Sequence, residues 1–161
     1  SKKRIIKSIN LLNLTAMRDL GMSNPKIAVV GLNPHAGENG LIGNEEEMII
    51  KPAIKSLQKK INVTGPFVPD AFWGNKTYKK FDMILGMYHD QVLIPFKLLN
   101  FNSGVNFTAG LNLIRTSPDH GTAYDIAGMN KANEWSLLQS YKYAIKIFQN
   151  RKRFIAETKS H

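Results

Sequence analysis

Two histidines of this chain stand where a metal ion could bind. His35 follows an apolar run at 26–32 that is typical of a buried strand, and His89 stands at the end of a second such run at 82–88. Because ligands bind beyond the carboxyl ends of parallel strands, both imidazoles are predicted to lie at one edge of a sheet. Neutral imidazole nitrogens are good ligands for divalent metals.

Neighbouring carboxylates strengthen the metal interpretation without completing it. Asp90 could accept the ring proton of His89, and Glu38 stands close to His35. A catalytic metal usually has three protein ligands and an open position, so two histidines make an incomplete centre. The alternative is that each histidine bonds only to a nearby backbone carbonyl.

Cationic and amide side chains form a second group of candidates. Lys97 and Arg115 lie in an otherwise apolar, glycine-rich central segment. Such cations are rarely buried without a partner, so a bound carboxylate or phosphate would explain them, and an ordinary ion pair would explain them equally well. Asn106 and Asn112 could bond to the same ligand or serve at turns and strand ends.

A histidine followed at once by glycine and small residues, in the run 119–128, forms a third candidate site. Such a run leads into a short helical turn and lets the backbone approach a flat ring or a phosphate closely. Asp125 could accept hydrogen bonds from a ribose diol, and an acid there favours NAD over NADP because it repels a 2′-phosphate. A plain helix start capped by Asp119 or Thr122 is the alternative.

The elements that would position these groups alternate between helix and strand. Apolar residues at helical spacing predict a first helix that ends near Leu20, with Gly21 as its cap. Strands are predicted at 26–32, at 82–88 and, as one or two short strands, at 103–116. This alternation predicts an α/β fold with helices around a mostly parallel sheet.

Three further segments complete the predicted order of elements. Asn44 and Glu47 resemble a capping box that opens a helix to about Lys60, with a kink expected at Pro52. The run 64–73 reads as a packed loop. A last helix is predicted from Asn133 to about Arg153, and one of its faces is apolar: Trp135, Leu138, Tyr141, Ile145 and Phe148.

Composition limits the classes of protein that remain. Of the 161 residues, 43% are hydrophobic and 21% charged, which suffices for a folded core. No run approaches the roughly 20 apolar residues of a membrane span, and the first residues lack the apolar stretch of a secretory signal. There is no cysteine for disulfides or thiolate ligands. We therefore expect a cytoplasmic protein without a membrane partner.

The formal charge of +10 is concentrated in the two terminal segments. A solvated basic face is the simplest explanation, and attraction of phosphorylated substrates is the second. Nucleic acid is not expected as a partner, because no basic strand with interleaved aromatic residues and no recognition-helix pattern accompanies the charge.

Five segments together resemble the PdxA family of 4-hydroxythreonine-4-phosphate dehydrogenases, which serves pyridoxal phosphate biosynthesis. They lie within about 26–133 and read GLNPHAGENGLIGNEE, GPFVPDAFW, YHDQVLIPFK, GVNFTAGL and IRTSPDHGTAYDIAG. The last also resembles the adenosine-binding loop of the wider isocitrate and isopropylmalate dehydrogenase group, which implies a nicotinamide site without a G-x-G-x-x-G motif. The resemblance implies part of that group's two-lobed fold.

The resemblance further implies how the chain divides and which residues act. Residues 1–100 would form most of one α/β lobe with metal and dimer elements, and 101–161 would return to the other lobe with the cofactor loop. A divalent metal (zinc, magnesium or cobalt) would be bound by His35 and His89. Substrate would contact Lys97, Asn106 and Arg115, and Lys97 is also the candidate catalytic group. The nicotinamide cofactor, NAD with NADP as the alternative, would be bound by His120, Gly121, Thr122, Ala123 and Asp125.

The implied reaction is oxidation of the 3-hydroxyl of 4-phosphohydroxy-L-threonine by NAD(P), followed by loss of carbon dioxide to give 3-amino-2-oxopropyl phosphate. A metal bound to the hydroxyl and the amine would lower the pKa of the alcohol. The family implies a homodimer whose active site is shared between subunits, so the two histidines could meet only across chains.

Family members are considerably longer, and the resemblance is to their C-terminal portion. It leaves out the family's third metal histidine and a histidine-threonine pair that contacts substrate, so we expect this segment alone to be inactive. Two rival classes stay open. A metal-dependent hydrolase or lyase would use His35, Glu38 and His89 without nicotinamide. A non-catalytic basic binding module would show a steeply salt-dependent affinity for nucleic acid.

Overall fold

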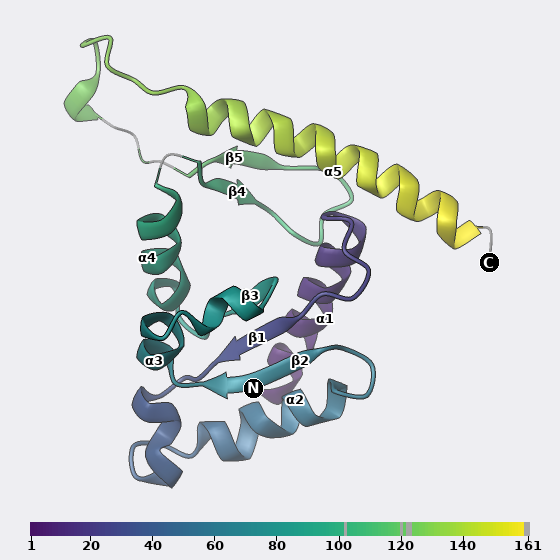
Figure 1. The fold of residues 1–161 in the computed structure, drawn as a ribbon, viewed down its shortest axis with the longest axis vertical. Coiled ribbons are helices and arrows are strands. Elements are labelled where there is room, and N and C mark those ends of the chain that lie inside the picture. Colours follow the sequence, from purple (N-terminus) through teal and green to yellow (C-terminus); the bar gives the residue numbers. More distant parts are fainter. Residues whose placement is uncertain (102, 120, 122–123, 160–161) are drawn as a thin grey trace.

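A parallel sheet forms the centre of the first hundred residues in this computed structural model, which describes residues 1–101, 103–119, 121 and 124–159. Its strands β1 (Ile27–Val30), β2 (Val63–Phe67) and β3 (Met83–Leu85) lie in the order β2-β1-β3, and β1 pairs in parallel with both neighbours (Figure 1). All four residues of β1 are buried, as expected for a central strand that is covered on both faces. The predicted α/β fold is confirmed.

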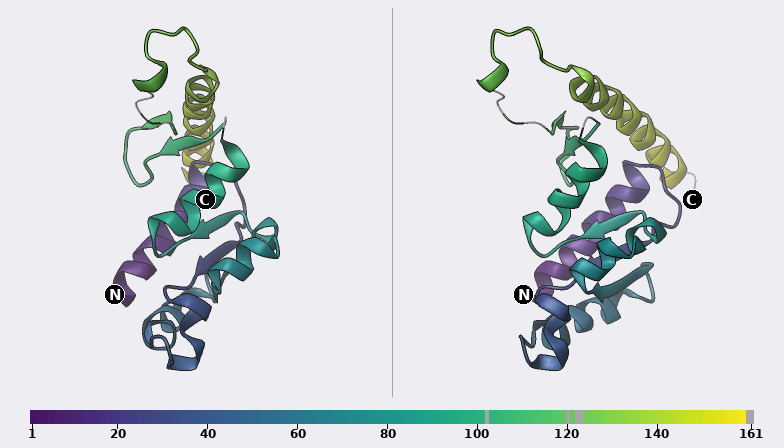
Figure 2. Two further views of the ribbon diagram at one scale, coloured as in Figure 1. Left: turned by 90° about the vertical axis from the view of Figure 1, so that its left-hand side faces the viewer. Right: turned by 60° about the vertical axis from the view of Figure 1, so that its left-hand side comes forward.

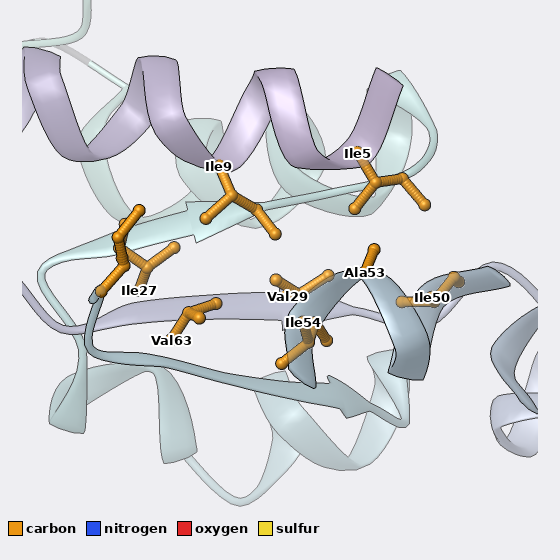
Figure 3. Packing of buried hydrophobic residues seen from close by; sticks show 9 residues of the cluster. Ile5, Ile9, Ile27, Val29, Ile50, Ala53, Ile54 and Val63 are labelled. Atoms are coloured by element: carbon orange, nitrogen blue, oxygen red, sulfur yellow. The ribbon is translucent and has the colours of Figure 1, made fainter. Parts of the chain in front are cut away.

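Helices α1 (Lys2–Arg18) and α2 (Lys51–Leu57) cover one face of the sheet. Figure 3 shows Ile5 and Ile9 of α1 pointing toward Val29 of β1. The helix ends close to the predicted place, and Gly21 follows with a left-handed φ of 73°. The buried residues on this face of the sheet are Ile5, Ile9, Ile27, Val29, Ile50, Ala53, Ile54, Ile61 and Val63.

An aromatic cluster covers the opposite face. Phe72, on the short helix α3 (Pro69–Gly74), packs against Ala28 and Val30, and its ring centroid lies 5.1 Å from that of Phe67. The prediction of a loop at 64–73 is therefore wrong, because this run forms β2 and α3. The prolines that suggested a loop are compatible with both elements, since β2 is an edge strand and Pro69 stands at the first position of its helix.

Two other predicted boundaries are corrected. The strand predicted at 82–88 is only Met83–Leu85, and His89 begins helix α4 (His89–Asn100) instead of ending a strand. The helix after the first loop opens with a π turn, η2 (Glu46–Ile50), and no side chain caps it, so the capping box of Asn44 and Glu47 is not formed. The acid at 46 has turned inward, and Glu47 instead pairs with Lys51 one turn on.

The last third of the described chain forms a second layer. Strands β4 (Val105–Phe107) and β5 (Thr116–Pro118) pair antiparallel, and helix α5 (Trp135–Lys159) lies across them (Figure 1). Close packing is possible because the helix residues at the contact are small: the Ser136 hydroxyl donates to the Gly104 carbonyl at 2.9 Å. Strand β4 lies within the predicted range 103–116, whereas β5 begins at its last residue; the last helix is confirmed, but it runs to Lys159 instead of ending at about Arg153.

A buried carboxylate joins α5 to the end of α1. Asp19 is 0% exposed and accepts hydrogen bonds from Arg18 Nε at 2.7 Å and from Arg151 Nε at 2.7 Å. Its carbonyl accepts a further bond from the Asn150 amide at 2.9 Å. Burial alone would raise the pKa of Asp19, but the two guanidinium groups outweigh burial and hold the pKa below its ordinary value.

Much apolar surface stays uncovered. The apolar face predicted for the last helix is exposed, from Leu138 at 37% to Tyr141 at 65%, whereas the buried residues of α5 are Ser136, Ser140 and Ile147. The accessible area is 11013 Å², against roughly 8,000 Å² for a compact monomer of this mass. Among the described helices, none has the length and apolar character needed to cross a membrane.

Candidate functional site

His35 lies on an unusual turn directly after β1. In η1 (Pro34–Gly40), the residues from His35 to Asn39 all have positive φ angles, between 44° and 84°. A left-handed backbone costs L-residues roughly 1–2 kcal/mol each, so a run of this kind forms only where the surroundings impose it. The imidazole of His35 is exposed at the carboxyl edge of the sheet.

A buried glutamate stands inside this turn. Glu46 is 1% exposed and accepts hydrogen bonds from the backbone N–H groups of Leu32 and Asn33 at 2.7 and 2.8 Å. The Asn33 side-chain amide donates a third bond at 2.9 Å. Burial alone would raise the pKa of Glu46, but these hydrogen bonds outweigh it and hold the pKa below its ordinary value.

His89 lies beyond the carboxyl end of the neighbouring strand, as the first residue of α4. Its Nδ1 is 2.6 Å from Asp90 Oδ1, and both side chains are 76% exposed. A carboxylate that accepts the Nδ1 proton leaves Nε2 as the free ligand atom, which is the usual arrangement behind a metal-binding histidine. The expected contact between Asp90 and His89 is thus present.

Gln91 connects the two histidine-bearing loops. Its side-chain oxygen accepts from the backbone N–H groups of Met87 and Tyr88 at 2.8 and 3.1 Å, and its amide donates to the Gly31 carbonyl at 2.8 Å. One side chain therefore fixes the loop before His89 against the end of β1, from which the His35 turn departs.

These groups fit a metal only in part. His35 and His89 follow adjacent parallel strands, and a hollow of about 390 Å³ at the same edge is lined by residues that include Leu32, Gly86 and Met87. The donor chemistry suits a divalent ion, but within the described residues no three histidine, aspartate or glutamate side chains gather closely enough to hold one. The described part of a single chain contains an incomplete centre.

The cationic and amide candidates lie farther along α4 and on the hairpin. Lys97 is half-buried two turns after His89, which is about 12 Å along the helix axis. Asn106 pairs with Ser117, and Thr108 accepts a hydrogen bond from Arg115 at 2.9 Å. Strand alternation therefore places Asn106 and Arg115 on one exposed face of the ladder. The premise that Arg115 is a buried cation is wrong.

The candidate cofactor turn stands apart from the sheet. Asp125 lies in the short turn η4 (Tyr124–Ile126), and its side chain is exposed. Both views in Figure 2 show 124–134 projecting beyond the hairpin and away from β1. Gly121 is also exposed, whereas the predicted residues His120, Thr122 and Ala123 lie outside the described residues.

A parallel sheet whose histidines gather beyond the carboxyl ends of its strands is typical of ligand-binding α/β enzymes. The chain belongs to a particular family of that class: the model of the family described as "Pyridoxal phosphate biosynthetic protein PdxA" matches residues 1–144. The family resemblance found in the sequence is confirmed.

Named relatives agree with the family assignment. A 4-hydroxythreonine-4-phosphate dehydrogenase of Bacteroides thetaiotaomicron is 49% identical over 95% of this chain and 42% of its own length. One from Sulfurihydrogenibium is 50% identical over 94% of this chain and 47% of its own length. A D-threonate 4-phosphate dehydrogenase of Pectobacterium atrosepticum is 48% identical over 81% of this chain and 40% of its own length. The chain thus spans less than half the length of these relatives.

Solved structures show the same fold. The 4-hydroxythreonine-4-phosphate dehydrogenase of Klebsiella pneumoniae superposes with a TM-score of 0.75 at 46% identity, over 91% of this chain and 45% of that one. A terephthalate 1,2-cis-dihydrodiol dehydrogenase of Burkholderia xenovorans gives a TM-score of 0.68 at 28% identity, over 91% and 46% of the two chains.

Two residues of the site escaped sequence reasoning. Glu46 stands in a run of three acids, 45–47, and neither it nor Gln91 was assigned a role from the sequence. Both lie within the segments that carry the family resemblance, but nothing in their spacing shows that their side chains turn inward. The division into lobes at residue 100 stays a prediction.

Proposed function

We propose that this chain is the C-terminal portion of a metal-dependent, NAD(P)-linked dehydrogenase of pyridoxal phosphate biosynthesis. The whole enzyme would oxidise the 3-hydroxyl of 4-phosphohydroxy-L-threonine and release carbon dioxide, which gives 3-amino-2-oxopropyl phosphate. The observation that carries this proposal is the 49–50% identity to relatives of that name over about 95% of the chain.

In this proposal His35 and His89 supply two ligands of a divalent ion. When bound, such an ion polarises the substrate hydroxyl and favours its deprotonation. The residues of this chain prepare the ligands: Asp90 accepts the Nδ1 proton of His89, and Gln91 holds the His89 loop against the end of β1. Both imidazoles are exposed, so both remain open to a metal and a substrate.

Substrate recognition is assigned to Lys97, Asn106 and Arg115. A guanidinium beside an amide suits a phosphate or a carboxylate, because both anions accept several hydrogen bonds at once. Lys97 lies on α4, which leads from His89 at the carboxyl edge of the sheet toward the β4–β5 hairpin. There it can bind the substrate carboxylate or transfer a proton.

The cofactor is assigned to the segment of the sequence that contains His120, Gly121, Thr122, Ala123 and Asp125. The exposed carboxylate of Asp125 supports this assignment, because it is free to accept hydrogen bonds from a ribose diol. A carboxylate at this position would repel a 2′-phosphate. We therefore expect NAD to be preferred over NADP.

We also propose a homodimer with a shared active site, and the incomplete metal centre of the described part of one chain supports it. Within the described part of one chain, no three histidine, aspartate or glutamate side chains lie close enough together to complete a metal centre. Uncovered apolar surface supports a large interface, since the chain exposes roughly 3,000 Å² more than a compact monomer would. A second chain, or the rest of a longer one, would bring the missing groups.

A second substrate deserves a test because of one relative. The D-threonate 4-phosphate dehydrogenase is 48% identical to this chain, and its substrate carries a hydroxyl where the other carries an amine. The same histidines and cations would serve either molecule. The choice between them is expected to rest on groups near that amine.

The deciding experiment follows NADH absorbance with either substrate, NAD and a divalent metal. The 161-residue chain is compared with a fusion in which the N-terminal portion of the Sulfurihydrogenibium relative precedes it. We expect activity only in the fusion. The His89→Ala variant of the fusion should lose this activity, whereas the control variant Lys59→Ala, which changes an exposed lysine just after α2, should keep it. NADH formation by the chain alone would contradict the expected inactivity, and no activity in the fusion would contradict the dehydrogenase itself.

A further inference from the structure

We propose that Glu46 is a positioning residue for His35, because its buried carboxylate holds the left-handed turn His35–Asn39 that presents the imidazole at the carboxyl edge of β1. Nothing in the resemblance or the relatives' names assigns a role to Glu46. The inference rests on the proposed function in one respect, namely that His35 binds a divalent metal.

The contacts of Glu46 are directed at the entry to the turn. One oxygen, Oε1, accepts from Leu32 N and Asn33 N, and the other, Oε2, accepts from Asn33 Nδ2. All three donors belong to the two residues before Pro34, where the chain leaves β1. A carboxylate fixed by three donors is a rigid anchor, since each bond involves a charged acceptor.

The turn also wraps around this carboxylate from its far side. A Cβ at Gly37 would lie 3.0 Å from Glu46 Oε2 and 2.5 Å from the Gly43 carbonyl, and a Cβ at Gly31 would lie 3.2 Å from Oε1. Backbone therefore approaches both oxygens as closely as glycine allows. The carboxylate is thus bonded to the two residues before Pro34 and packed against Gly37 inside the turn.

Two of the three consecutive acids face the loop before His35, and Glu46 is the more deeply buried of the two: the Asn33 amide also donates to Glu45 Oε2 at 2.8 Å. Glu46 is the first residue of the π turn η2, and it is buried, whereas Glu45 is half-buried and Glu47 is exposed. Single π turns are rare and are frequently found at functional sites. Here Glu46, at the start of the π turn, is the acid that also accepts from the backbone N–H groups of Leu32 and Asn33, whereas Glu47 in the same turn is exposed.

The test is a double-mutant cycle with zinc chloride as the probe, measured by isothermal titration calorimetry on the fusion that restores the N-terminal portion, with every substitution made in the part that is this chain. Glu46→Gln keeps the size of the side chain but places an NH₂ group against N–H donors. We expect it to weaken zinc affinity at least tenfold. Glu47→Gln is the matched control, because Glu47 is exposed and pairs with Lys51 on the outside of the helix, and it should leave the affinity within twofold.

The cycle separates positioning from a general effect on the fold. If Glu46 acts through His35, then Glu46→Gln should cause no further loss of zinc affinity in a His35→Ala background. An equal loss in both backgrounds, or an affinity of Glu46→Gln within twofold of the unsubstituted fusion, would overturn the inference. If His35→Ala does not itself lower the affinity, the metal role of His35 fails and the inference falls with it.

A second variant keeps the inference testable if Glu46→Gln does not fold, as judged by far-ultraviolet circular dichroism. Gly37→Ala disturbs the same turn from the other side, since its new methyl group would press on the Glu46 carboxylate and the Gly43 carbonyl. It should weaken zinc binding in the otherwise unsubstituted fusion and not in the His35→Ala background. A loss of equal size in both backgrounds would again overturn the inference.

Discussion

Asp19 joins the end of α1 to α5, and replacing it by asparagine tests whether this contact stabilises the fold. The carboxylate is 0% exposed and lies 2.7 Å from both Arg18 Nε and Arg151 Nε. Asparagine has nearly the same shape, but it removes the charge and turns an NH₂ group toward guanidinium donors. Removing one partner of a buried ion pair costs about 3–5 kcal/mol of unfolding free energy.

A loss of this size is large for a domain of this length. It corresponds to a fall in Tm of about 6–20 °C. Thermal and urea unfolding followed by circular dichroism would measure it. Asp70→Asn is the matched control, because Asp70 is exposed in the first turn of α3 and its replacement should cost less than about 1 kcal/mol. An Asp19→Asn variant within about 1 kcal/mol of the original chain would refute the reasoning.

The pH dependence of stability provides an independent check. The arginines hold the pKa of Asp19 below its ordinary value of 3.8, against the opposing effect of burial. A lowered pKa means that the carboxylate stabilises the fold above the pKa of the unfolded state, and that this contribution is lost as pH falls through the folded-state pKa. The unfolding free energy of the original chain should therefore fall below about pH 4 more steeply than that of Asp19→Asn. If the unfolding free energies of the two proteins changed in parallel with pH, the charge of Asp19 would not contribute to stability.

Two further substitutions have sharp expectations. Phe72→Ala should lower the unfolding free energy by about 3–5 kcal/mol, because this ring is 2% exposed in the aromatic cluster, and Phe101→Ala, at 82% exposed, should change it by less than about 0.5 kcal/mol in urea unfolding. Gln91→Leu should remove the hydrogen bonds of this side chain to Met87 N, Tyr88 N and the Gly31 carbonyl. Calorimetry on the fusion should therefore show weaker zinc binding than in Gln58→Leu, which removes one long bond of 3.3 Å to the Val63 carbonyl. Equal zinc affinities in the two glutamine variants would count against a role for Gln91.

The sequence alone was informative wherever local pattern decides structure. The apolar run 26–32 contains the buried central strand, and the spacing of Ile5, Ile9 and Ala16 matches the buried side of the first helix. Family motifs were enough to identify the family. The spacing of apolar residues is a reliable guide in these segments, because the positions that a helix or strand buries repeat with the geometry of its backbone.

Local pattern failed where proline or tertiary contact overrides propensity. Two prolines at 64–73 suggested a loop, although an edge strand and a helix start both accept proline. The apolar run before His89 suggested a strand of seven residues, but the Gln91 side chain satisfies two backbone N–H groups there and starts a helix instead. Spacing cannot show such a contact, because it depends on where one side chain points.

For the candidate site too, some features could be predicted from the sequence and others depended on the tertiary structure. Residue types and motifs in the sequence determined the candidates His35, His89, Lys97 and Arg115, because metal and anion chemistry limits which side chains can serve. Tertiary structure alone decided that the two histidines follow adjacent strands, that Arg115 is exposed beside Asn106, and that Glu46 is buried inside the His35 turn. Which chemical groups are present is fixed by covalent structure, whereas which groups meet is fixed by strand order, burial and hydrogen bonds between residues far apart in the chain.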